Sequence, residues 1–170
     1  MIQRPNQNEY NPYYEKYISL IPIGDILTFL KTQHEDLQAL LRDASNEQGE
    51  YRYAPEKWSL KEVIGHMIDT ERIMSYRLLA VSRGETMALP SFDQDEYVKG
   101  ADFDLFPLAD LLADFALVRA CTCSLLGGLS DDVLARTGMV ADYPTTARAL
   151  AYIIAGHELH HLSIIKERYL

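Results

Sequence analysis

Cysteine and long apolar runs are scarce in this sequence, and both shortages narrow what the protein can be. Only two of the 170 residues are cysteine, Cys121 and Cys123. On a helix, residues two apart point about 200° away from each other, so a disulfide is geometrically poor and we expect buried free thiols. The apolar runs are broken by charge well short of a membrane span, and the polar N-terminus lacks a signal-peptide core. These features predict a cytoplasmic protein with no membrane partner.

Positive charge is also in short supply. Sixteen Lys and Arg residues face 25 Asp and Glu, which gives a net charge of −9 and an isoelectric point of about 4.9. A nucleic-acid backbone is bound by clustered basic side chains that displace counterions, so we expect no nucleic-acid partner. The apolar fraction of 48% and charged fraction of 24% are typical of a globular protein. A chain of this length is expected to form a single domain, residues 1–170.

Strand-like alternation is missing as well, whereas helical periodicity is strong. Ser59 and Glu62 form a capping box, the sharpest helix start in the chain. We expect the 46–56 stretch to be a loop, because Gly49 and Pro55 interrupt it. The helical spacing of apolar residues predicts four helices, at residues 25–44, 59–82, 105–126 and 145 to near the C-terminus.

The connection from Gly84 to Asp104 is too long for a tight hairpin between the second and third helices. We expect it to run back along the bundle, so that these two helices are parallel and the fourth returns. The predicted fold class is therefore all-α, a four-helix bundle with a long crossover between helices two and three. The tyrosine-rich residues 1–21 form a lead segment that is expected to pack on the bundle or on a second subunit.

Three of the five histidines lie within five residues, in the segment His157-Glu158-Leu159-His160-His161. His157 and His161 share one helix face and lie one turn apart, a spacing that lets two imidazoles hold one metal ion. A shared cation would satisfy both buried rings at once, which favours a metal site over an ordinary hydrogen-bonded core histidine. The residues that flank the pair on this face are apolar: Leu150, Ile153, Ile154 and Ile164.

A third ligand has to come from another helix, and His66 is the candidate. It lies seven residues after Ser59, about 10 Å along its helix. The midpoint of His157 and His161 lies ten residues before Tyr169, about 15 Å from the end of the fourth helix. If helices two and four are antiparallel neighbours, these levels nearly coincide.

Two alternatives concern the same segment. His160 lies about 100° around the helix from His161, so we expect it at the margin of the site or on a subunit surface, and His34 outside the site. The segment also spells H-E-x-x-H, the zincin protease motif in which Glu158 would be a general base. The extended form of that motif needs glycine at 164 and histidine at 167, which the chain lacks. We interpret the match as coincidental, and a metalloprotease is the least favoured function.

These residues also carry a resemblance to a known family. The sequence is similar to the DinB-like superfamily, and most of all to its YfiT-type branch, often labelled as metal-dependent hydrolases. The resemblance spans residues 22–170 and implies an up-down-down-up four-helix bundle, a homodimer, and metal ligation by His66, His157 and His161. The matching blocks are Trp58 to His66, Ile68 to Arg72, Phe92 to Asp95 and Ala155 to His161.

The activity implied by this resemblance is less specific, since similar proteins include bacillithiol S-transferases and mycothiol-dependent isomerases. A three-histidine site leaves an open metal position for water or a thiol, either of which becomes a usable nucleophile near neutral pH. We expect a thiol S-transferase or a hydrolase that acts on a small molecule, with a low-molecular-weight thiol as one partner. The divalent ion is expected to be zinc or nickel ahead of iron or manganese. A non-catalytic, metal-stabilised dimeric module for binding or stress response is the alternative.

Three further side chains are candidates near the ligands. Asp69 and Glu158 are the closest carboxylates in sequence, and either could orient an imidazole or accept a proton. The alternative is that Glu158 is a helix-boundary residue and Asp69 a surface ion-pair partner. Arg77 shares the His66 face two turns further on, and it could bind an anionic group of the substrate.

Overall fold

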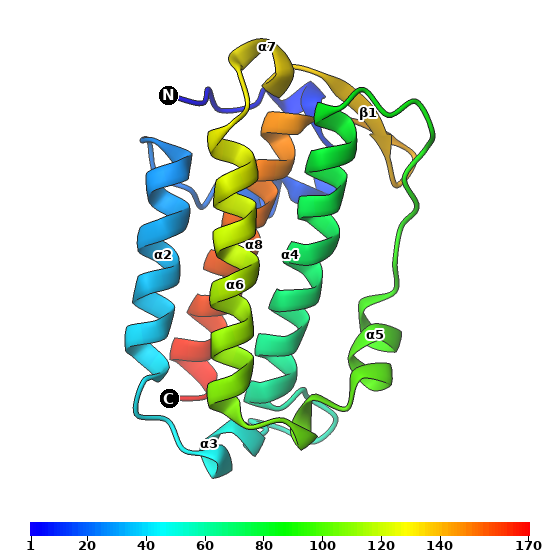
Figure 1. Ribbon diagram of the computed structural model, residues 1–170. Coiled ribbons are helices and arrows are strands. Elements are labelled where there is room, and N and C mark those ends of the chain that lie inside the picture. Colours follow the sequence, from blue (N-terminus) through cyan, green and yellow to red (C-terminus); the bar gives the residue numbers. More distant parts are fainter.

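The computed structural model describes all residues, 1–170. Figure 1 shows four long helices packed side by side, with α4 and α6 running in one direction and α2 and α8 in the other. The predicted four-helix bundle with an up-down-down-up order is confirmed. No helix combines the length and hydrophobicity that crossing a membrane would need. The four helices are α2 (Ile26–Leu41), α4 (Leu60–Ser82), α6 (Leu108–Gly127) and α8 (Ala147–Arg168).

The helix starts follow from their caps. At α4 the predicted capping box is present, since Ser59 Oγ accepts from the Glu62 N–H at 3.0 Å and the Glu62 carboxylate accepts from the Ser59 N–H at 2.8 Å. Helix α8 begins after Thr146, whose hydroxyl accepts from the Ala149 N–H at 3.2 Å. Helix α6 begins three residues later than expected, because the Leu108 N–H is capped by the Asn46 side chain at 2.9 Å, from a distant part of the chain.

The expectation of no strand is wrong at one hairpin. Strands β1 (Thr137–Val140) and β2 (Tyr143–Thr146) pair antiparallel at the end of the bundle. The turn uses Ala141 and Asp142 with φ of 48° and 62°, the left-handed conformation that tight hairpins need. Four-residue strands are too short to show a clear alternation, and Pro144 obscures the pattern further. Helix α7 (Asp131–Leu134) leads from α6 into the hairpin.

Two smaller expectations also need correction. The 46–56 stretch contains a short helix, α3 (Asn46–Glu50), which Ser45 caps in a second capping box. Both cysteines are free thiols, as expected, but only Cys123 is buried, and Cys121 is exposed. Cys121 lies on the outward face of α6 because the two residues point in nearly opposite directions.

The crossover between α4 and α6 descends along the outside of α4 (Figure 1). It contains α5 (Gln94–Ala101) and a 3₁₀ turn at Phe103–Leu105. Its upper part is fixed to the hairpin, since the Leu89 N–H donates to the Met139 carbonyl at 2.8 Å. Its lower part lies against α4 at Gly65, where an added Cβ would be 2.4 Å from the Phe103 ring. The crossover therefore touches α4 directly beside His66.

The N-terminal lead segment lies on α8 and consists of two 3₁₀ turns (Gln7–Glu9 and Pro12–Tyr14) and α1 (Glu15–Ile18). The Glu9 carboxylate pairs with Arg148 and accepts from the Thr146 hydroxyl at 2.9 Å. A Cβ added at Gly156 would lie 2.3 Å from the Tyr17 carbonyl oxygen, so only glycine permits this approach. The lead segment therefore touches α8 directly beside His157.

The buried apolar residues form two clusters, one towards each end of the bundle. In every long helix the boundary between them is marked by buried polar side chains. Their positions put a polar layer across the middle of the bundle, and His66 and His157 belong to it. The layer comprises Gln33 and His34 on α2, His66, Thr70 and Glu71 on α4, Arg119 and Thr122 on α6, and His157 and Glu158 on α8.

The Gly156→Ala substitution is expected to lower the free energy of unfolding by roughly 1–3 kcal/mol, because the Tyr17 backbone has no room for the added methyl. Urea denaturation followed by circular dichroism measures this. Gly127→Ala is the matched control, since its Cβ would make only an ordinary contact, 3.6 Å from the Leu27 side chain. Equal stability of the two variants would contradict the close packing of the lead segment on α8.

Candidate metal centre

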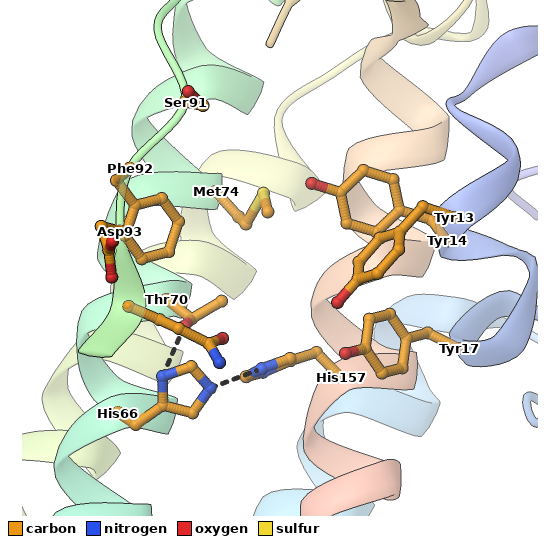
Figure 2. A pocket seen from close by; sticks show the side chains of 11 residues that line it. Tyr13, Tyr14, Tyr17, His66, Thr70, Met74, Ser91, Phe92, Asp93 and His157 are labelled. Carbon is orange, nitrogen blue, oxygen red and sulfur yellow. Dashed lines mark hydrogen bonds between the residues drawn. The ribbon is translucent and has the colours of Figure 1, made fainter. Parts of the chain in front are cut away.

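Three imidazoles converge in the polar layer. His66 comes from α4, and His157 and His161 come from adjacent turns of α8. One ring nitrogen from each lies within 4.8 Å of the other two, and His66 Nε2 is 3.0 Å from His157 Nε2. Figure 2 shows the His66 and His157 rings directed at each other from the two helices. The antiparallel contact of α4 with α8 produces this match in level.

The donor set fits a divalent metal ion. Tetrahedral zinc with nitrogen ligands at about 2.0–2.1 Å separates those nitrogens by about 3.3 Å, which is compatible with the observed spread. His161 Nδ1 is buried without any hydrogen-bond partner. Buried polar nitrogens ordinarily have a partner, and convergent imidazoles that lack one are what a cation would satisfy. The three-histidine site therefore supports a divalent metal.

The protonation states suit this role. Burial, with a further contribution from His160, lowers the pKa of His66 to about 4. Burial also lowers the pKa of His161 to about 3, aided by His66 and His160. The pKa of His157 falls well below its ordinary value, first through burial and then through the neighbouring imidazoles. All three rings are therefore neutral at pH 7 and offer a lone pair.

Two neighbours hold His66 in its orientation. The Thr70 hydroxyl lies 3.5 Å from Nδ1, one turn along α4 (Figure 2). The Trp58 ring packs against the imidazole with centroids 4.8 Å apart. Both contacts leave Nε2 directed towards His157. Neighbouring groups commonly fix the ring orientation of a histidine that binds a metal in this way.

A buried ion-pair network lies beside the histidines in the same layer. The Arg119 guanidinium donates to Glu71 at 2.8 and 2.6 Å, and to Glu158 at 2.6 Å. It also donates to the Leu30 carbonyl at 2.7 Å. Burial raises the pKa of Glu158 to about 7, against the opposing effect of Arg119. Sequence reasoning missed Arg119 and Glu71, although a charged residue within an apolar stretch of α6 was an available signal.

The remaining predicted site residues lie in different places. Glu158 is directed at α6 and does not line a cleft, but it shares a cavity of about 10 Å³ with His157 and Thr70. Asp69 lies outside the clefts at the histidines, and its carboxylate is 3.8 Å from the Arg72 guanidinium, the surface ion pair that the sequence left open as the alternative. His160 and His34 are not members of the cluster.

Arg77 is also buried and acts on the crossover. Its guanidinium donates to the Pro90 carbonyl and lies 5.7 Å from the centre of the Phe92 ring. These contacts hold the crossover against α4. Arg77 does not line the cleft that opens onto His66 and His157.

A cleft of about 500 Å³, here called the tyrosine cleft, opens onto His66 and His157. Figure 2 shows tyrosines of the lead segment on one side and the crossover on the other, with the two histidines at the floor. Sequence reasoning expected the tyrosines to pack on the bundle or on a second subunit, and missed that they line this cleft. The lining residues are Tyr13, Tyr14, Tyr17, His66, Thr70, Met74, Ser91, Phe92, Asp93, Gln94 and His157.

A second cleft of about 270 Å³, here called the aromatic cleft, opens onto His161 from another side. The loop before α4, the start of α5 and the end of α8 enclose it. Its lining residues are Tyr53, Glu56, Lys57, Trp58, Val63, Gln94, Asp95, His161, Ile164 and Tyr169.

The fold and the site define a four-helix-bundle protein with a buried three-histidine centre that suits a divalent metal. Residues 30–165 match the family model described as the DinB superfamily, and the chain belongs to this superfamily. A protein of Oceanobacillus iheyensis, named as an inferred metal-dependent hydrolase, is 29% identical over 136 residues, which are 77% of this chain and 78% of that protein.

A solved structure shows the same fold. YfiT from Bacillus subtilis, described as a probable metal-dependent hydrolase with an unusual four-helix bundle topology, is 18% identical to this chain. The similarity has a TM-score of 0.75 and covers 98% of this chain and 91% of YfiT. The family model confirms the resemblance to the DinB-like superfamily, and the similarity to YfiT confirms the fold.

The purified protein is expected to carry about one divalent ion per chain, and His66→Ala to lose most of it, because the two imidazoles of α8 bind weakly alone. Elemental analysis of dialysed protein measures this. His160→Ala is the matched control, a neighbouring histidine outside the cluster. Full occupancy in His66→Ala, or loss of metal from His160→Ala, would assign the site to other residues.

Metal retention is expected to persist to about pH 5, because the lowered pKa of His66, about 4, keeps its ring neutral there. The sign for the metal-free protein follows from the same shifts. Below the unfolded pKa of about 6.5 the unfolded state binds protons that the folded state does not, so stability falls as pH drops from there towards 4. Half-loss of metal near pH 6.5, as for exposed histidines, would contradict the buried site.

Proposed function

We propose that this protein is a metal-dependent hydrolase of a small molecule, with His66, His157 and His161 as the metal ligands. The observation that carries the proposal is the position of neutral, convergent imidazoles at the floor of a cleft large enough for a small organic substrate. The names of the two similar proteins point to the same chemistry.

A bound divalent ion would supply positive charge that lowers the pKa of water and polarises a substrate carbonyl. Three neutral protein ligands would leave the charge of the ion uncompensated. Catalytic zinc sites have three protein ligands, whereas structural zinc sites have four. Thr70 and Trp58 hold the His66 ring in orientation. Phe92 and Met74, beside the histidines, limit the access of bulk water to the floor of the cleft.

The lead segment supplies groups that would bind the substrate. The pKa of Tyr17 is raised by burial and by Tyr13, so its hydroxyl stays protonated and can donate a hydrogen bond. Lys16 lies 3.9 Å from the centre of the Tyr13 ring and brings a positive charge to this wall. Lys16 does not line the cleft, but its charge would favour an anionic substrate there, and we assign to Arg77 the positioning of the crossover wall.

The roles of the two carboxylates follow from their contacts. Glu158 is held by Arg119 away from the tyrosine cleft, which argues against the general base of a zincin protease. We propose that Glu158 positions α8 through its bond to Arg119. For Asp69, its pairing with Arg72 supports a structural role.

Thiol S-transfer is the second candidate, because a thiol is an alternative nucleophile at the same centre. The observation that favours it is the Met74 and Phe92 surface beside the imidazoles, which suits a soft sulfur ligand better than bulk water. The homodimer, the cytoplasmic location and the preference for zinc or nickel stay predictions.

Metal-loaded protein is expected to hydrolyse members of a panel of small esters and amides, and to lose this activity on chelation. The His157→Ala variant should fall by roughly a hundredfold or more in kcat/KM, because it lacks a ligand at the reaction centre. His34→Ala is the matched control, because His34 is a buried histidine of the same layer that lies outside the cluster.

A parallel arm of the same experiment adds bacillithiol, mycothiol, glutathione or cysteine with an electrophile. Turnover only with a thiol would favour the S-transferase. Turnover in neither arm, with metal bound, would favour the non-catalytic binding module.

A further inference from the structure

The three imidazoles are reached from two sides. His66 and His157 line the tyrosine cleft, whereas His161 lines the aromatic cleft. Gln94, at the start of α5, is the one residue that lines both. A centre that needed only one organic substrate and water would not require a second, separately walled approach.

The two clefts differ in chemistry. The walls of the tyrosine cleft carry phenol hydroxyls, Ser91 and Asp93 beside its apolar groups. The aromatic cleft is walled by Trp58, Tyr53 and Tyr169 with two aliphatic side chains, Val63 and Ile164, and it is also lined by three exposed charged residues, two from the loop before α4 and one from α5. Ring faces and aliphatic carbons favour a flat apolar ring, and the polar half of the lining favours a polar substituent on that ring. The volume of the aromatic cleft, about 270 Å³, suits a molecule with one ring.

The walls of the aromatic cleft are held in place by the protein itself. The Tyr169 hydroxyl donates to the Trp58 carbonyl at 2.6 Å. The Tyr53 and Tyr169 rings meet edge to face at 5.3 Å and 87°. The Trp58 ring is packed on His66, so the cleft wall continues into the metal centre. A cleft fixed in this way binds without a large ordering cost.

The loop that forms the rim is strained at one residue. Glu56 has φ of 61°, a left-handed conformation that is unfavourable for a residue with a Cβ. It stands two residues before Trp58 and lines the cleft. Strained backbone of this kind persists where the surroundings demand a particular shape, often at ligand sites.

We propose that the aromatic cleft is a separate binding site for a small molecule with one flat apolar ring and a polar substituent, which approaches His161 while the substrate occupies the tyrosine cleft. The interpretation of this molecule as a second reactant rests on the proposed function. The binding itself does not, because the walls are formed without the metal. Trp58 is the single tryptophan of the chain, so its fluorescence reports on this cleft and on a neighbouring cleft that Trp58 forms with α5.

The test is a titration of the full chain with 4-nitrobenzyl alcohol, whose flat nitroaryl ring quenches tryptophan on contact. Saturable quenching is expected with a dissociation constant at or below about a millimolar, as for a ligand of this size. Benzyl alcohol should compete, and cyclohexylmethanol, of similar size but not flat, should compete less well. The titration is repeated after a chelator has removed the metal, and binding should persist. Binding should persist as well if the protein proves to have no hydrolase activity.

Two filling variants locate the ligand. Ile164→Phe puts a ring into the aromatic cleft from a half-buried position and should weaken quenching roughly tenfold. Ser91→Phe, an exposed residue of the tyrosine cleft, is the matched control and should leave it unchanged. Quenching that Ile164→Phe does not weaken would put the ligand outside the aromatic cleft and overturn the proposal; a loss in Ser91→Phe would then assign the ligand to the tyrosine cleft. Linear, non-saturable quenching would overturn it as well.

Discussion

The buried guanidinium of Arg119 joins all four long helices at one level. It extends from α6, bonds to Glu71 of α4 and Glu158 of α8, and donates to the Leu30 carbonyl of α2. Taking three charged groups out of water is expensive, and their attraction offsets that cost only when the geometry is good. A shift of one helix along its axis would leave a buried charge unpaired, so the network ties the helices to one relative level. The histidine centre needs the same level, because His157 directly precedes Glu158 and His66 lies five residues before Glu71.

The bundle supplies the imidazoles, but the segments outside it make the clefts. A glycine directly precedes the first histidine of α4 and the first histidine of α8: Gly65 precedes His66, and Gly156 precedes His157. At the first the Phe103 ring rests on α4, and at the second the Tyr17 backbone rests on α8. These close approaches bring the crossover and the lead segment to the two sides of the centre, as Figure 2 shows for the tyrosine cleft. The same helix packing therefore explains both the position of the three imidazoles and the walls around them.

Local patterns were sufficient for much of this structure. The helical spacing of apolar residues predicted the four helices, the capping box located the start of α4, and the length of the crossover predicted that α4 and α6 are parallel. The i, i+4 spacing of His157 and His161, with the level argument for His66, predicted the cluster that forms. These features depend on contacts within one helix or on the direction of neighbouring helices, and the amino-acid sequence alone carries that information. The β-hairpin was missed because its strands are short and its turn lacks the usual asparagine or glycine.

The tertiary structure alone decided the surroundings of the centre. Glu158 and Asp69 both lie within three residues of a candidate histidine in the sequence, yet Glu158 is buried against Arg119 and Asp69 pairs with Arg72 at the surface. Arg77 lies on the expected helix face but holds the crossover. Tyr17 reaches His157 across 140 positions of the chain, with ring centroids 5.6 Å apart. Such contacts depend on how separate segments pack, and packing is set by shape and burial across the whole molecule. Residue spacing within one segment does not encode them.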